Sequence, residues 1–361
     1  MLALALVGCT GARVPAAAPA AQAAPDGPVV RAPTATAPPT EAAPVHVTGG
    51  LVASVAGAPV LAGVDLGLYQ RNGLDVSIET FTATPQIMTA IAAGQLDFGQ
   101  VTMGAAAFNA YHRGVDLTII AAGSGGAVPL VVRKDLWDSS AVRAVADLRD
   151  RTVALNATGN ILEYSLHKVL ERGNLTAADL HIVFMPFPEM VAALQNEAID
   201  AAMMLEPAAS TAVARGAGVI LEEQVGSSPS ENPWYAPGLQ AGMLMANKQW
   251  AADHPDATVA LIKSYLQTVR RVQGTRIHND AEALASIERW TKVKPEIVKQ
   301  ATVTYWAPNG RLDTATLMDE QRFYIAAGST DYKEPISISA VYSGQYLEAA
   351  LEQIGTVPET E

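Results

Sequence analysis

The sequence predicts an α/β protein that is built from two related lobes. Short apolar strands alternate with helical segments, a pattern typical of βαβ units, and the alternation occurs twice along the chain. Residues 194–202 (Leu-Gln-Asn-Glu-Ala-Ile-Asp-Ala-Ala) echo residues 91–99 (Ile-Ala-Ala-Gly-Gln-Leu-Asp-Phe-Gly). Strands joined by helices form mostly parallel sheets with helices on their faces. We therefore expect each lobe to be a mixed, mostly parallel sheet flanked by helices.

Composition excludes several classes of protein. The chain has 361 residues, 49% of them hydrophobic, which suggests two domains and a sizeable core. Lys and Arg number 24 against 36 Asp and Glu, and the resulting net charge of −12 argues against a nucleic-acid binder. Cys9 is the only cysteine. A disulfide framework, a cysteine zinc site, an iron–sulfur cluster and a cysteine nucleophile in the folded body are therefore excluded.

The first 44 residues are not expected to belong to the fold. The apolar run 1–7 leads into Leu6-Val7-Gly8-Cys9, which resembles a bacterial lipobox, so we expect a signal segment at 1–9 and lipids on Cys9. The alternative is a chance cysteine near a signal peptide. Residues 10–44 are rich in Ala and Pro and are expected to form a disordered tether. No later stretch has the roughly 18 apolar residues that a membrane span needs, so we expect a lipid-anchored, extracytoplasmic domain.

The first lobe is predicted from strands at 45–48, 74–79, 96–101 and 117–121 and from helices at 60–69, 86–93 and 105–113. Thr84 is expected as the N-cap of the second helix, with Pro85 at its first position. The second lobe is predicted from strands at 152–155, 181–184 and 199–204 and a helix at 188–196, with 156–160 opening another helix that ends at Arg172. Further helices are expected at 256–273, 280–290, 295–301 and 313–327.

Several short motifs occur in a specific order between residues 45 and 355. They include Ala58-Pro59, Gly67-Leu68-Tyr69, the stretch 92–98, Arg113-Gly114-Val115-Asp116, and Glu206-Pro207. In this order they resemble the periplasmic substrate-binding proteins of ABC importers, in the group that binds nitrate, sulfonates, taurine and thiamine-pyrimidine precursors. Each motif is weak alone, and the specificity of the resemblance lies in their order and spacing.

The resemblance implies a type II periplasmic-binding-protein fold, with two crossing strands at the hinge and the ligand between the lobes. Lobe 1 would comprise 45–131 plus 243–361, and lobe 2 would comprise 132–242. The crossings would lie near 130–133 and 242–246. The implied partners are a small-molecule ligand, an ABC permease and its ATPase, with the membrane reached only through the lipid anchor.

Candidate ligand contacts come from the turns between strands and helices, because ligands of open α/β sheets bind outside the carboxyl ends of the strands. The candidates in the first lobe are Ser54, Gly57, Pro59, Thr82, Thr84, Gln100, Thr102 and Ser124. Those in the second lobe are Asn156, Thr158, Asn160, Phe187, Glu206, Trp234 and Tyr235. The Thr and Asn residues could instead be ordinary helix caps, Glu206 a structural hinge carboxylate, and the aromatic residues packing groups.

The sequence predicts no enzyme, no metal and no cofactor. The six histidines show no HExxH spacing, and no P-loop or GxSxG motif is present. An enzyme of the thiamine-pyrimidine synthase type is the alternative, but that type uses a cysteine-rich motif that a single Cys9 cannot supply. A ligand-sensing domain for a signalling receptor would share the fold.

The ligand class is predicted from the same turns. They offer Thr, Asn, Gln and Ser and no Arg, which favours a nitrogen heterocycle such as a pyrimidine thiamine precursor or a flavin-like vitamin. The alternative is a sulfonate-, taurine- or nitrate-type anion held by helix N-termini at Thr84 and Thr158. We expect a monomer.

Overall fold

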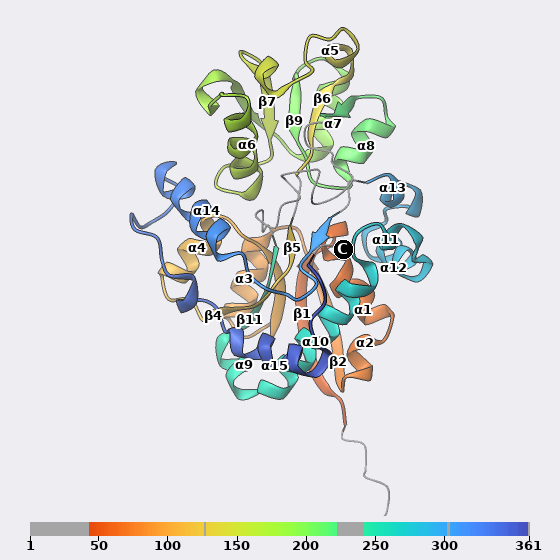
Figure 1. Cartoon of the computed structure of the whole chain (residues 1–361), viewed down its shortest axis with the longest axis vertical. Helices are drawn as coiled ribbons and strands as arrows, with labels where there is room; N and C mark the ends of the chain where they lie inside the picture. The colour runs from red at the N-terminus through yellow and green to blue at the C-terminus, as the bar shows by residue number, and fades with distance from the viewer. Residues whose placement is uncertain (1–42, 126–127, 222–241, 302–303, 360–361) are drawn as a thin grey trace, which may run out of the picture. The chain divides into compact units, whose positions relative to one another are not determined.

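Two five-stranded mixed sheets organise the folded part of the chain (Figure 1). The structure is a computed structural model, and it describes residues 43–125, 128–221, 242–301 and 304–359. The predicted α/β fold, with mixed sheets flanked by helices, is confirmed.

The first sheet has the strand order β2-β1-β3-β11-β4. Its strands are β1 (Val45–Val52), β2 (Leu74–Phe81), β3 (Phe98–Thr102), β4 (Leu117–Ala122) and β11 (Gly242–Asn247). β1 pairs in parallel with β2 and β3, whereas β11 pairs antiparallel with β3 and β4. All strands except β11 therefore point the same way, and their carboxyl ends meet at one edge.

The second sheet repeats this arrangement. Its strands are β6 (Leu130–Arg133), β7 (Thr152–Leu155), β8 (His181–Phe184), β9 (Ala201–Met203) and β10 (Gly218–Ile220). Read from the β8 edge the order is β8-β7-β9-β6-β10, and only β6 opposes the others. In both sheets the antiparallel strand takes the fourth place, which is the internal similarity that the sequence echo predicts.

The two echoed segments have the same structural task. Asp97 accepts a hydrogen bond from the Thr48 amide through Oδ2 at 2.7 Å, and its own amide donates to the Thr48 carbonyl at 2.9 Å. Asp200 makes the same two bonds with Thr152, both at 2.9 Å. Each aspartate directly precedes its own strand, β3 or β9, and ties that strand to the neighbouring strand β1 or β7, so these carboxylates serve the fold and not a ligand.

Helices cover both sheets. The helices that follow strands of the first sheet in the chain are α1 (Ala58–Asp65), α2 (Leu68–Arg71), α3 (Thr84–Ala92), α4 (Ala105–His112), α9 (Lys248–Asp253), α10 (Pro255–Val272), α11 (Arg276–Asn279), α12 (Ala281–Thr291), α13 (Pro295–Gln300), α14 (Thr314–Ala326) and α15 (Gly344–Ile354). Those of the second sheet are α5 (Lys134–Asp138), α6 (Ile161–Arg172), α7 (Phe187–Gln195) and α8 (Ala208–Ala214).

Short elements complete the chain. The strands β5 (Ser124–Gly125) and β12 (Tyr305–Trp306) pair with each other, and 3₁₀ turns lie at Val55–Gly57, Val145–Leu148, Ala177–Asp179 and Ile338–Ala340. Among the described residues no helix is both long and apolar enough to cross a membrane.

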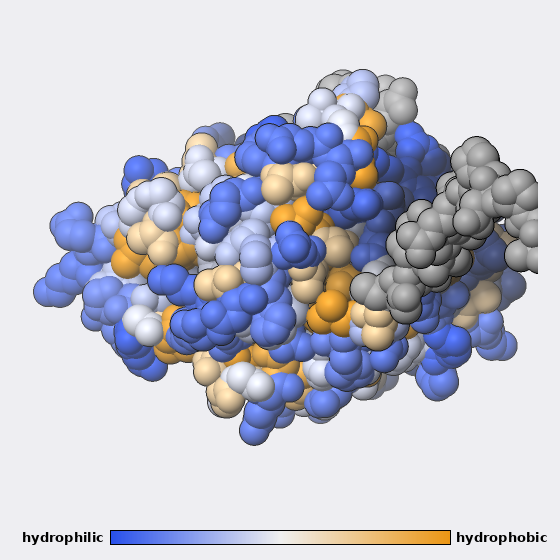
Figure 2. Space-filling model, turned by 90° about the horizontal axis from the view of Figure 1, so that it is seen from below, coloured by the Kyte–Doolittle hydropathy of each residue, from blue (hydrophilic) through white to orange (hydrophobic). Residues whose placement is uncertain are grey.

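The apolar core follows the sheet faces. One cluster packs α1, α10, α12 and α15 on the first sheet, and Tyr69, Tyr265 and Trp306 are its largest fully buried side chains. A second cluster packs α7 and α8 on one face of the second sheet. A third joins residues of α3, α4, α6 and α14, so helices attached to both sheets share one core. Seen from below, the surface is mostly hydrophilic with small apolar patches (Figure 2).

Several predicted boundaries were wrong. Ala83, not Thr84, is the N-cap of α3, and Thr84 and Pro85 are its first two residues. The helix expected at 60–69 starts at Ala58 and breaks at Gly67, whose φ of +66° is left-handed. The strands expected at 96–101 and 199–204 begin later than predicted, at Phe98 and Ala201. The residue before each start, Asp97 or Asp200, uses its side chain to bond the neighbouring strand. Helices α5, α8, α9, α11 and α15 were not predicted.

The chain passes from the first sheet to the second between β4 and β6 and returns between β10 and β11. The expected crossings near 130–133 and 242–246 therefore fall on the strands that receive the chain. The lobe boundaries at 131/132 and 242/243 stay a prediction.

Candidate functional site

The turn after β1 builds the first part of the candidate site. The Gly57 amide donates to the Ser54 carbonyl at 3.1 Å, and Gly57 then caps α1, whose second residue is Pro59. Gly57 and Pro59 are buried, whereas Ser54 is half-buried. Ser54 is therefore the member of this turn whose side chain keeps some exposure.

Gln100, in β3, lies against the same turn. Its Nε2 donates to the Ala56 carbonyl at 2.8 Å, and Trp306 Nε1 donates to that oxygen at 3.0 Å. The Gln100 Oε1 is buried and has no hydrogen-bond partner among the described residues. An unpartnered acceptor is costly, so Gln100 is a strong candidate to receive a donor from a ligand. Trp306 therefore belongs to this part of the candidate site, although no sequence motif identified it.

The turn after β2 is already hydrogen-bonded to itself. The Thr82 amide and hydroxyl donate to Gln86 Oε1 at 3.3 and 3.0 Å. Thr82 is exposed and Thr84 half-buried. After β4, Ser124 is buried and pairs with Trp306, which makes it part of the β5–β12 ladder.

The loop before α6 differs from its prediction. Asn160 is the N-cap of α6, and its Oδ1 accepts from the amides of Leu162 and Glu163 at 3.1 and 3.2 Å. Asn160 Nδ2 donates to Asn156 Oδ1 at 2.8 Å. The anion alternative needs free N–H groups at this helix N-terminus, and a cap side chain takes these two amides. Thr158 is exposed and is not the cap.

A carboxylate also faces this loop. Glu163 Oε2 accepts from the Gly159 amide at 2.6 Å. The negative charge at the start of α6 opposes the binding of an anion there, since it occupies the position that the helix dipole would offer.

The structure brings the β3 turn and the α6 loop into direct contact. Gly104 and Asn160 form an antiparallel bridge, and the Ala105 amide donates to the Gly159 carbonyl at 2.9 Å. A Cβ at Gly104 would lie 2.9 Å from that carbonyl oxygen, so the approach requires glycine. Thr102, the half-buried last residue of β3, thus lies two residues from the contact with the second-sheet half of the site.

Glu206 and Phe187 stand at the other two strand ends of the second sheet. Glu206 accepts from the Ser210 amide and hydroxyl, both at 3.0 Å, and so holds the start of α8. Phe187 is half-buried and packs against two core clusters. Both residues therefore have a structural task, and a ligand contact from either stays a prediction. Cys9, Trp234 and Tyr235 lie outside the described residues.

The charges around these turns are few and negative. The turns 53–59, 82–86, 100–105, 156–163, 184–190 and 204–207 hold Glu163, Glu189 and Glu206 and no Lys, Arg or His. Among the described residues no cluster of acidic, His or Cys side chains could hold a metal ion. The arrangement suits hydrogen bonding to a small polar molecule.

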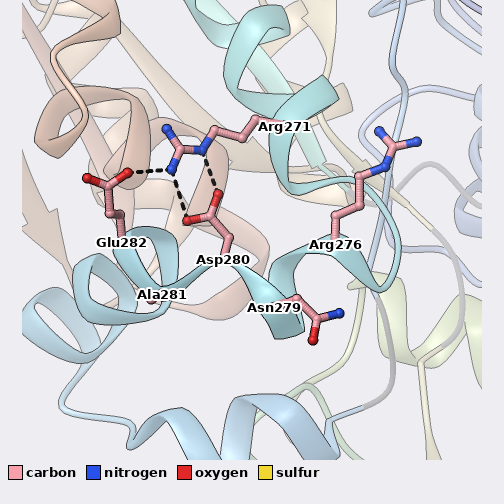
Figure 3. Close-up of a pocket in the computed structure, with 6 residues that line it drawn as sticks. All are labelled: Arg271, Arg276, Asn279, Asp280, Ala281 and Glu282. Carbon is pink, nitrogen blue, oxygen red and sulfur yellow. Dashed lines mark hydrogen bonds and ion pairs between the residues drawn. The ribbon is translucent and has the colours of Figure 1, made fainter.

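A separate surface pocket of about 550 Å³ lies between α10 and α12 (Figure 3). Arg271 turns toward Asp280 and Glu282 and bonds both, with distances of 2.5–3.0 Å, while Arg276 points away. The Arg271 guanidinium holds the pKa of Asp280 below its usual value. Because Arg271 is neutralised by two carboxylates, this pocket is a poor anion site.

Comparisons with known proteins agree with the fold. The chain is 28% identical over 240 residues to the bicarbonate transport ATP-binding protein CmpC of Synechocystis, which covers 62% of this chain and 34% of that protein. The chain thus spans about a third of that relative's length.

Two solved structures share the fold at low identity. The alkanesulfonate-binding protein SsuA of Xanthomonas axonopodis, bound to MOPS, superposes with a TM-score of 0.62 at 19% identity over 83% of this chain and 99% of SsuA. The desulfurization enzyme DSZB superposes with a TM-score of 0.57 at 16% identity over 86% of this chain and 99% of DSZB. Binding proteins and an enzyme therefore use this architecture.

The model of the NMT1-like family matches residues 40–288. The match covers both sheets and more than half of the chain, and it confirms the family resemblance that the ordered motifs predicted. This protein belongs to the NMT1-like family.

Proposed function

We propose that the protein is an extracytoplasmic substrate-binding lipoprotein of an ABC importer, which captures a small molecule between its two sheets and delivers it to the permease. The observation that carries the proposal is the contact of the β3 turn with the α6 loop at Gly104 and Asn160. It supports the proposal because it joins a strand-end turn of one sheet to a strand-end loop of the other, next to which closing of the lobes would surround a ligand. The likenesses to CmpC and SsuA support this role.

The proposed ligand is a nitrogen heterocycle, such as a pyrimidine thiamine precursor or a flavin-like vitamin. The unpartnered Gln100 Oε1 supports it, because that acceptor needs a ligand that carries an N–H or O–H donor. The absence of Lys, Arg and His from the turns supports it as well. A sulfonate-, taurine- or nitrate-type anion is the second candidate, favoured by the likeness to SsuA.

The experiment is ligand titration by calorimetry on wild type, with Gln100→Leu as the test variant. We expect one-to-one binding in wild type and a loss of about 1–3 kcal/mol in the variant, the cost of removing a buried hydrogen-bond acceptor from its partner. Gln95→Leu, an exposed glutamine after α3, is the matched control. Equal affinity in wild type and Gln100→Leu would remove Gln100 from the site.

An enzyme is the alternative function, and the fold likeness to DSZB is the observation that favours it. Incubating the bound ligand with the protein and following it by mass spectrometry separates the two. Binding without conversion agrees with the proposal, and multiple turnovers would replace it with an enzymatic role.

A further inference from the structure

Phe184 carries the most exposed large hydrophobic side chain of the described residues. It is the last residue of β8 and 49% of its surface is exposed, although the ring of a phenylalanine is normally buried. β8 ends at the carboxyl edge of the second sheet, where the candidate site lies. The exposure of an aromatic ring at this edge therefore indicates a contact with another molecule.

The register places the ring beside the α6 loop. Phe184 pairs with Leu155, and Leu155 leads directly into Asn156. Side chains alternate along a strand, so Phe184 shares its face with Ile182, which packs against the core cluster that contains Leu155 and residues of α6. The ring thus continues the α6 face of the sheet outward, next to the polar loop 156–160.

Phe187 is the less suitable aromatic residue. It is half-buried, and its ring already packs against the apolar clusters on both faces of the second sheet. Val183 and Met185, the residues on either side of Phe184, lie on the opposite face of the sheet and pack against the α7–α8 cluster. Only Phe184 of this segment leaves a ring face exposed.

A second exposed apolar side chain stands at the same edge. Leu205 follows β9 by two residues and is 37% exposed. β8 and β9 are the two neighbours of β7, so apolar surface lies on both sides of the strand that leads into the polar loop. The charged residues of these turns are glutamates only.

We infer that Phe184 is a specificity-determining residue whose ring stacks on a planar, heteroaromatic ligand. This inference rests on the proposed function and names the ligand class of the same site. A flat ring covers exposed aromatic surface, while its polar substituents face the neighbouring 156–160 loop. Compact inorganic anions such as nitrate or bicarbonate would leave the ring exposed to water, and the only charged side chains that these turns offer them are glutamates.

Calorimetry with a panel of probes tests the inference. The planar probes are 4-amino-5-hydroxymethyl-2-methylpyrimidine and riboflavin, and the compact probes are nitrate, bicarbonate and taurine. We expect saturable binding of a planar probe, weakened roughly 5- to 150-fold by Phe184→Ala, the usual effect of removing a stacking ring. Phe184→Tyr should restore most of the affinity.

Val45→Ala is the matched control, because Val45 is 42% exposed at the amino end of β1, away from both carboxyl edges. It should leave the affinity unchanged. Sedimentation of wild type and Phe184→Ala tests whether the ring instead covers a second copy of the chain. A dimer that Phe184→Ala dissociates, with unchanged ligand affinity, would overturn the inference.

The outcomes separate the inference from the proposed function. If a compact probe binds and the planar probes do not, the inference fails and the binding function stands. Equal planar-probe affinity in wild type and Phe184→Ala overturns the inference as well. If none of the probes binds, the inference fails, and the proposed function then fails only if protein isolated from its source also carries no small molecule by native mass spectrometry.

Discussion

Thr158 and Asn160 are two residues apart and have different tasks. Asn160 caps α6, whereas Thr158 is exposed in the loop beside the contact with α4. Thr158→Ala should therefore weaken ligand binding by about 0.5–1.5 kcal/mol through a lost hydroxyl contact, with an unchanged melting temperature of the ligand-free protein. Calorimetry and thermal melting on the same variant measure both quantities.

Asn160→Ala is the paired variant for that experiment. It removes the cap and should lower the unfolding free energy by about 0.5–2 kcal/mol. If Thr158→Ala instead lowers stability and leaves affinity intact, Thr158 does not belong to the site.

Glu320 is fully buried in α14, and neither carboxylate oxygen has a hydrogen-bond partner among the described residues. Burial, with Asp319 and Asp313 nearby, raises the pKa of Glu320 well above its usual value. The neutral form is thus the one that the fold accommodates. Its stability is fully present below the unfolded pKa of about 4.3 and is lost as the pH rises toward the folded pKa.

Glu320→Gln should remove this pH dependence. Relative to the variant, wild type should lose about 1.4 kcal/mol of unfolding free energy per pH unit above roughly pH 5, until the folded pKa is passed. Denaturant unfolding of both proteins between pH 4 and pH 8 measures the difference. If the unfolding free energies of the two proteins change in parallel over that range, ionisation of Glu320 does not destabilise the folded state, and the prediction is wrong.

At the scale of elements, the contact between α4 and the α6 loop links the two sheets. A Cβ at Gly104 would meet the Gly159 carbonyl at 2.9 Å, and backbone cannot move aside as a flexible side chain can. Gly104→Ala should therefore separate the two turns and weaken ligand affinity about tenfold or more, since misplacing site residues by about 1 Å has large effects. Calorimetry measures the affinity, and circular dichroism confirms that the fold remains.

Ala106→Ser, at an exposed position in the same helix, is the control for that substitution and should bind normally. If Gly104→Ala binds as well as wild type, the contact between α4 and the α6 loop does not position the site.

A second contact between elements of the two sheets lies one helical turn along α6. Tyr164 donates to Asp319 Oδ2 at 2.7 Å, and the Phe323 ring lies 4.9 Å from the His167 ring, centroid to centroid. α14 packs against both α4 and α6, so it connects the helices on which the two halves of the site depend. Its place in the chain, far from either helix, gives no local signal of this contact.

Most strands and helices could be predicted because their signals are local. β7 and β8 have the predicted bounds, because each is a short run of mainly apolar residues between turns. Boundaries failed where a side chain acts across the fold, as Asp97 does on Thr48. The site followed from strand-end positions, but the cap at Asn160, the exposed ring of Phe184 and the bond from Trp306 to Ala56 depend on tertiary packing that local pattern does not encode.

At the scale of the whole molecule, the predicted lipid anchor decides where the protein acts. Cys9→Ser should release the protein from the membrane fraction into the soluble fraction, because the thiol is the only site for the lipids. Cell fractionation with immunodetection measures the shift, and Thr10→Ser serves as the control that leaves Cys9 in place. A protein that stays with the membrane after Cys9→Ser would contradict the lipobox interpretation.

Ligand capture by two lobes is the central claim, and solution X-ray scattering of the protein with and without saturating ligand tests it most directly. A ligand that touches both lobes binds the closed state better and shifts the hinge equilibrium toward it. It also stabilises the fold by about 2.7 kcal/mol at a hundredfold excess over Kd, which confirms saturation in the same sample. We predict a smaller radius of gyration with ligand; an unchanged radius at proven saturation would contradict the account.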